Sequence, residues 1–149
     1  MEIERKFLVK EQLWEAIEKP CPSRIVQAYL VNSAEKTVRI RIKGTKGFLT
    51  IKGPTQGISR AEFEYEIPLK DAEELISTFA EKVIEKFRYE ISFKNHLWEV
   101  DVFTGKLEGL YLAEIELNSE DEHFELPEWV GEEVSTDPNY YNSNLINKV

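Results

Sequence analysis

The sequence is poor in the residues that stabilise secreted proteins or bind zinc, with one cysteine, Cys21, and two histidines. A lone cysteine excludes an internal disulfide and a cysteine zinc site, and it is typical of a reducing compartment. The opening MEIERKFLV carries charges where a signal peptide needs an apolar run. No uncharged stretch approaches the roughly 20 residues that span a bilayer. We therefore expect a cytoplasmic protein that does not interact with membranes.

Excess positive charge and glycine-rich phosphate loops are also absent. The chain has 28 acidic and 19 basic side chains, giving a net charge of -9, so unspecific nucleic-acid binding is not expected. It contains neither a Walker loop nor Gly-x-Gly-x-x-Gly, so any phosphate would be held by side chains rather than by a helix N-terminus. An anionic substrate would require locally concentrated positive charge, or divalent cations that supply it.

What the chain does contain is a globular composition and many short alternating runs. Its 149 residues, 42% hydrophobic and 32% charged, predict one domain over residues 1–149. Period-two alternation between turn residues predicts an antiparallel sheet or barrel. The eight expected strands are Glu2 to Val9, Ile25 to Val31, Thr37 to Lys43, Phe48 to Lys52, Arg60 to Ile67, Lys86 to Phe93, Trp98 to Phe103 and Tyr111 to Leu117.

Helices are expected in fewer places. One should cover Glu11 to Glu18, and a second should follow Asp71 as N-cap, with an apolar face that includes Ala72 and Phe79. A short helix is expected around Pro127 to Glu133, and the closing STDPNYYNSNLI predicts a turn followed by one or two helical turns. Whether this tail closes the mouth of a tunnel or packs outside is left open by the sequence.

The charged side of each strand is the informative one. Same-sign pairs recur at i and i+2, such as Glu2 with Glu4 and Arg39 with Arg41. An ordinary solvent face would also be charged, but like carboxylates about 7 Å apart repel each other unless a cation lies between them. Oxygen ligands suit Mg²⁺ or Mn²⁺, and paired basic residues suit a phosphate chain. The pattern favours a site that holds metal and polyphosphate together, with no catalytic role for His96 or His123.

The motifs, taken in order, identify a family. The opening EIERK contains the ExExK pattern of Glu2, Glu4 and Lys6, and it is followed by QAYL, TVRIRIKG, GFLTIKGP, RAEFEYEIP, KFRYEI, WEVDVFTG, GLYLAEIEL and DPNYYNSNL. This series resembles the CYTH superfamily, also called triphosphate tunnel metalloenzymes, over nearly the whole chain. The resemblance implies an α+β, mainly β fold: an eight-stranded antiparallel barrel with charged side chains inside and helices packed outside.

The resemblance also implies roles for individual residues. Triphosphate oxygens would be bound by the basic side, which comprises Lys6, Arg39, Arg41, Lys52, Arg60 and Arg88. Metal would be held, directly or through water, by the acidic side, which comprises Glu2, Glu4, Glu62, Glu64, Asp101, Glu114 and Glu116. Tyr29 matches a tyrosine that pairs in some bacterial members with a lysine, here Lys86, so these two residues are the expected catalytic dyad. Glu66, Glu90 and Glu99 share the inward parity but are expected at the rims.

The implied activity is Mg²⁺- or Mn²⁺-dependent hydrolysis of a small triphosphate, most simply inorganic triphosphate to pyrophosphate and phosphate. Thiamine triphosphatase, nucleoside triphosphatase and class IV adenylate cyclase use the same tunnel and stay open as alternatives. An RNA-capping triphosphatase is disfavoured by the acidic composition. Outside enzymes, the chain could be a polyphosphate or nucleotide sensor, although both complete acidic motifs argue against this. The sequence does not decide whether the chain forms a homodimer.

Overall fold

The structure is a computed structural model that describes all 149 residues, and its main element is one antiparallel sheet. Its strands are β1 (Glu2–Val9), β2 (Ser23–Asn32), β3 (Thr37–Lys43), β4 (Lys46–Lys52), β5 (Ser59–Arg60), β6 (Glu62–Ile67), β7 (Ile84–Phe93), β8 (His96–Phe103), β9 (Tyr111–Glu116) and β10 (Val130–Glu133). The helices are α1 (Glu11–Glu15), α2 (Leu69–Phe79) and α3 (Asn142–Leu145), with short 3-10 segments at Gly105–Leu107, Pro138–Tyr140 and Ile146–Lys148.

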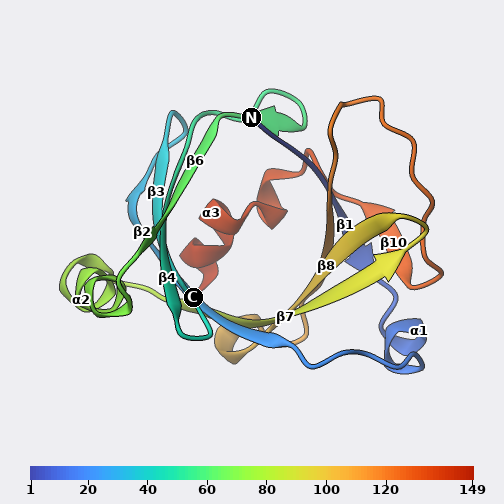
Figure 1. Cartoon of the computed structure of the whole chain (residues 1–149), viewed down its shortest axis with the longest axis horizontal. Coiled ribbons are helices and arrows are strands. Elements are labelled where there is room, and N and C mark those ends of the chain that lie inside the picture. Colours follow the sequence, from blue (N-terminus) through green and yellow to red (C-terminus); the bar gives the residue numbers. More distant parts are fainter.

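The sheet curls around a central space (Figure 1). Its hydrogen-bonded order is β10-β1-β9-β8-β7-β2-β3-β4-β6, and β5 also pairs with β1. The fold is thus mainly antiparallel β, as predicted, but the curled sheet is not closed by a continuous ladder. The strand expected over Arg60 to Ile67 is interrupted at Ala61, because the chain there leaves its pairing with β1 and joins β4.

Two helix predictions differ from the structure. Residues 127–133 were expected to be helical, but Val130–Glu133 form strand β10, which pairs with β1 through Phe7 and Glu133. The free edge of β1 determines this conformation, since a tertiary partner overrides a weak local preference. The second helix starts at Leu69, with Pro68 rather than Asp71 as its N-cap, so Asp71 lies in the first helical turn. The first helix is shorter than expected and ends at Glu15.

Alternation along the strands separates an apolar outer layer from a charged inner space. The outward residues of β1, β8 and β9 pack under α1 and the segment that leads to β10, where Trp14, Trp98 and Trp129 meet edge to face. Helix α2 lies outside the sheet beside β3 and β4 (Figure 1). None of the helices has the length and apolar character needed to cross a membrane.

The C-terminal segment runs inside the curled sheet rather than over its outer surface (Figure 1). Leu145 and Ile146 are buried in an apolar cluster with the inward residues Ile84, Phe103 and Leu112. This packing fills one end of the central space with hydrocarbon, so only the rest of that space is available to a polar ligand. The tail, whose place the sequence left open, therefore forms part of the interior.

The contact between α2 and β4 depends on Gly47. A Cβ atom built at Gly47 would lie 2.6 Å from the Cβ of Ala72, whereas one at Gly53 would meet only the Cβ of Ala61 at 3.5 Å. Overpacking of this kind costs about 1–3 kcal/mol. We expect Gly47→Ala to lower the free energy of unfolding in urea by about 2 kcal/mol and Gly53→Ala to leave it nearly unchanged. Equal effects of the two substitutions would show that α2 does not pack tightly on β4.

Candidate functional site

A polar cavity of about 150 Å³ occupies the charged part of the central space, and none of its 12 lining residues is hydrophobic. We call it the inner cavity. Strands β1, β3, β4, β6, β7, β8 and β9 and helix α3 all contribute to its wall. The lining residues are Glu2, Glu4, Arg39, Arg41, Lys52, Glu62, Glu64, Arg88, Glu99, Glu114, Glu116 and Asn142.

The basic side of the inner cavity is held in place by hydrogen bonds and ion pairs. Arg39 Nη2 donates to the Thr50 hydroxyl at 3.2 Å, and that hydroxyl donates to Glu64 at 2.9 Å. Lys52 Nζ lies 2.9 Å from Glu2 and 3.3 Å from Glu62. Burial acts against the charge of Lys52, but the carboxylates around it raise its pKa above the usual value. These cations are therefore charged and oriented before any ligand arrives.

The acidic side brings like charges together. Glu4 lies directly opposite Glu116 in the register of β1 and β9, and Glu99 lies opposite Glu114 in that of β8 and β9. Burial, followed by the charges of Glu114 and Glu2, raises the pKa of Glu4 well above its usual value. For Glu114, burial is outweighed by the charges of Lys6 and other cations, which lower its pKa to about 2. The charges of Lys6 and Lys52 thus offset the burial and repulsion at Glu4 only in part.

This donor set fits a hard divalent cation by its chemistry. Carboxylate oxygens are the ligands that Mg²⁺ and Mn²⁺ prefer, and opposed like charges across a strand pair are destabilising unless a cation lies between them. In the structure most of these carboxylates pair with lysine or arginine, whereas Glu4 and Glu116 form no ion pair, and no three acidic side chains converge as a preformed metal site. Binding a cation would therefore require some of these ion pairs to open.

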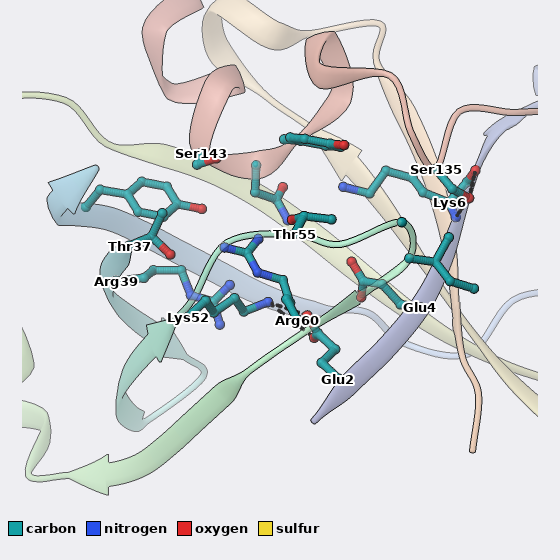
Figure 2. Close-up of a pocket in the computed structure, with 15 residues that line it drawn as sticks. Glu2, Glu4, Lys6, Thr37, Arg39, Lys52, Thr55, Arg60, Ser135 and Ser143 are labelled. Carbon is teal, nitrogen blue, oxygen red and sulfur yellow. Dashed lines mark hydrogen bonds and ion pairs between the residues drawn. The ribbon is translucent and has the colours of Figure 1, made fainter. Parts of the chain in front are cut away.

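A second cavity adjoins the inner one and shares Glu2, Glu4, Arg39, Lys52 and Asn142 with it. Figure 2 shows that Glu2 and Glu4 reach into this cavity from β1, opposite Arg39 and Lys52. Its other lining residues are Lys6, Tyr29, Thr37, Thr55, Gly57, Ile58, Arg60, Ser135, Tyr141 and Ser143.

Beyond the second cavity lies an outer hollow of about 510 Å³, whose lining includes Arg60, Asn32 and Asn144. Arg60 borders both and is held by two hydrogen bonds from its guanidinium to the Gly53 carbonyl, the shorter of 2.8 Å. This arrangement gives the inner cavity a polar approach with a cation at its entrance.

Two predicted residues, Lys86 and Asp101, line neither of the two cavities and form a buried network with Arg88. Asp101 accepts two hydrogen bonds from Arg88, at 2.7 and 2.9 Å, and lies 2.6 Å from Lys86 Nζ. Burial opposes the charge of Asp101, but Arg88 and Lys86 hold its pKa well below the usual range. Burial lowers the pKa of Lys86 to about 7, with Arg88 and Arg41 adding to the shift and Asp101 opposing it. No hydrogen bond joins Lys86 to Tyr29, which borders the second cavity.

Glu99 and Asn142 belong to the inner cavity, although neither was predicted as a site residue. Glu99 was expected at a rim, yet it lines the inner cavity and lies 3.3 Å from Arg88. Glu99 lies two residues before Asp101 on β8, so both side chains point to the same face of the sheet, and this spacing could have indicated its position. Asn142 comes from the irregular tail, where no periodicity assigns a side chain to a face. Its Oδ1 is buried and has no hydrogen-bond partner.

Comparisons with known proteins agree on one family. The CYTH domain profile matches residues 1–148. The inorganic triphosphatase of Acetivibrio thermocellus is 47% identical over 146 residues, which cover 97% of this chain and 92% of that protein. The inorganic triphosphatase of Nitrosomonas europaea is 38% identical over 148 residues, covering 97% of this chain and 95% of its own.

The fold is also similar to a solved structure. The crystal structure of the inorganic triphosphatase NE1496 superimposes with a TM-score of 0.67 at 34% identity, covering 98% of this chain and 94% of that one. The similarity therefore includes the strands that build the cavities and the C-terminal segment that enters them.

Proposed function

The chain belongs to the CYTH domain family, and from that premise we propose that it hydrolyses inorganic triphosphate to pyrophosphate and phosphate. The observation that carries the proposal is the inner cavity, in which opposing carboxylates and guanidinium or ammonium groups surround a space without apolar lining. A chain of phosphates needs many fixed cationic donors, and a metal that neutralises it needs oxygen ligands. Both requirements are met by side chains of one polypeptide, so a homodimer is not needed to complete the site.

The basic residues bind and orient the substrate in this proposal. Arg39, Arg41 and Arg88 present planar guanidinium groups that suit phosphate oxygens, and Lys6 and Lys52 add compact ammonium charges. Arg60 is placed to meet the anion at the entrance. Once substrate and metal are bound, these donors would be held in place, so they would stabilise charge that develops on the bridging oxygen without reorganising during the reaction.

The acidic residues are proposed to hold Mg²⁺ or Mn²⁺. The ligands, direct or through water, would be drawn from Glu2, Glu4, Glu62, Glu64, Asp101, Glu114 and Glu116. When bound, the metal supplies neutralisation of phosphate oxygens and activation of water. The ion pairs that Lys52 makes with Glu2 and Glu62 would open as these carboxylates turn to the metal. Lys52 would then be released toward the substrate.

Lys86 and Tyr29 are proposed to act in proton handling. A lysine with a pKa near 7 can hold or release a proton at neutral pH, which an ordinary lysine cannot do. Tyr29 borders the second cavity, so a pairing with Lys86 would require movement within the site. Full turnover by a Tyr29→Phe variant would remove Tyr29 from this role.

The test is phosphate release from inorganic triphosphate, ATP, thiamine triphosphate and pyrophosphate, measured with Mg²⁺, with Mn²⁺ and with chelator, while cyclic AMP is followed in the ATP reactions. We expect the highest kcat/KM with inorganic triphosphate and none in chelator. Preference for thiamine triphosphate or a nucleotide would change the substrate within the same mechanism. Cyclic AMP formation would favour a cyclase. Tight binding of triphosphate without turnover would instead favour a sensor.

We also propose a cellular compartment and a range of partners for this activity. An acidic chain with a lone exposed cysteine suits the reducing cytoplasm. Neither a nucleic acid nor a membrane is proposed as a partner, since the basic residues of the site lie inside the curled sheet. A fractionation experiment that recovered the protein in the membrane pellet would contradict this part of the proposal.

A further inference from the structure

Gln27 is the one fully buried amide side chain among the strands around the cavities, and it contacts a single cation. It lies on β2 and is 0% exposed. Its Oε1 accepts hydrogen bonds from Arg41 Nε at 3.0 Å and from Arg41 Nη2 at 2.8 Å. The two residues are directly opposite each other in the register of β2 and β3. A single carbonyl oxygen thus fixes one edge of the guanidinium.

Arg41 differs from its neighbours in having no carboxylate partner. Lys6 lies 3.8 Å from Glu114, Arg39 lies 3.6 Å from Glu64, and Arg88 pairs with Asp101. Arg41 forms no ion pair, although it lines the inner cavity beside these groups. Its charge is therefore oriented by a neutral residue and is not neutralised within the protein.

The geometry points to Gln27 as a positioning residue that presents Arg41 to the substrate as an uncompensated cation. A carboxylate at this place would hold the guanidinium equally well but would cancel its charge, and an apolar side chain would leave it free to rotate. The Nε2 group of Gln27 is buried without a hydrogen-bond partner. The amide therefore has N–H donors that no protein group uses. The inference rests on the proposed function, because the ligand that uses Arg41 is taken to be a triphosphate.

Burial and the neighbouring charges of Arg39 and Arg88 lower the pKa of Arg41 to about 9. A guanidinium under this repulsion stays charged at neutral pH. A bound anion stabilises it more than it would stabilise a guanidinium that already pairs with a carboxylate. Arg41 would thus contribute to substrate affinity without first having to leave a protein carboxylate. The other arginines of the cavity must exchange a partner to do the same.

The test is a double-mutant cycle on kcat/KM for tripolyphosphate, with Gln27→Met, Arg41→Lys and the double variant. Loss of a hydrogen bond to a charged group corresponds to about tenfold, so we expect Gln27→Met to lower kcat/KM about tenfold, chiefly through KM. In the Arg41→Lys background the same substitution should change kcat/KM by less than about twofold, because lysine lacks the guanidinium edge that Gln27 holds through two N–H groups. Gln27→Glu should lower kcat/KM at least as much as Gln27→Met. The control is Gln12→Glu, the same change on the exposed face of α1, which should leave kcat/KM unchanged.

Two results would overturn the inference. One is an equal loss from Gln27→Met in both backgrounds, which would mean a purely structural role. The other is an Arg41 side-chain Nε–H signal, in nitrogen-15 NMR, that is the same in the unaltered protein and in Gln27→Met. If the unaltered protein does not hydrolyse tripolyphosphate, the proposed function fails, and the cycle is then scored on the dissociation constant of tripolyphosphate.

Discussion

Replacement of Glu4 by Gln is expected to lower kcat for triphosphate hydrolysis by at least about 100-fold, as expected for losing a ligand in a metal-dependent phosphoryl-transfer site. Glu4 lies in both polar cavities and opposite Glu116. The amide keeps the size of the carboxylate but removes the charge that a divalent cation needs. We therefore also expect a higher Mg²⁺ or Mn²⁺ concentration for half-maximal activity.

Although Glu4→Gln should lose activity, we do not expect it to lose stability, measured as the free energy of unfolding. The pKa of Glu4 is raised in the folded protein, so its ionised form is disfavoured there, and at pH 7 this lowers the free energy of unfolding. Removing the charge should leave the metal-free protein at least as stable as before in urea. The matched control is Glu66→Gln, since Glu66 is exposed on β6 and should retain activity within a factor of about two. Activity close to that of the unaltered protein in Glu4→Gln would remove Glu4 from the site.

Replacement of Asp101 by Asn is expected to produce the largest loss of stability, about 3–5 kcal/mol in the free energy of unfolding at pH 7, because breaking a buried ion pair leaves its partners uncompensated. Asp101 is 1% exposed and serves both Arg88 and Lys86. Asn can accept a hydrogen bond from one of them but can neutralise neither. Activity should fall as well, since Arg88 would lose its orientation.

The lowered pKa of Asp101 determines how this loss of stability depends on pH. The pKa of Asp101 is lower in the folded protein than in the unfolded chain, where it is about 3.9. The stabilisation is therefore fully present above that pH and is lost as the pH falls through the folded-state value. The part of the difference between the unaltered protein and Asp101→Asn that comes from ionisation of Asp101 should be complete above about pH 5 and shrink only below. The exposed Asp121 provides the matched control, and equal effects of Asp121→Asn and Asp101→Asn would contradict the buried network.

Strand parity made much of the site predictable from the sequence. Period-two alternation assigned Glu2, Glu4, Arg39 and Arg41 to one face, and the structure places all of them in the inner cavity. The sequence could not show how each charge is satisfied, since that depends on the cross-strand register. Asp101 illustrates this, because its neighbours across the strand pair and along β7 occupy both of its oxygens.

The irregular parts of the chain were the least predictable. Residues 130–133 lack strong alternation, and only the free edge of β1 makes them a strand. The tail is positioned by burial of Leu145 and Ile146 inside the sheet, a tertiary effect that no local pattern indicates. Asn142 enters the site as a consequence of that packing. Lys6, whose Nζ donates to the Tyr140 carbonyl at 2.9 Å, further ties the tail to a predicted substrate-binding residue.

The most direct test of the tunnel interpretation is a phosphorus-31 NMR time course of tripolyphosphate incubated with the protein. With Mg²⁺ or Mn²⁺ present we expect the tripolyphosphate signals to be replaced by pyrophosphate and orthophosphate in equal amounts, and with chelator we expect no change. Tripolyphosphate that stays intact in the presence of either metal, with the protein folded and the anion bound, would contradict hydrolysis in the inner cavity and identify the chain as a binding protein.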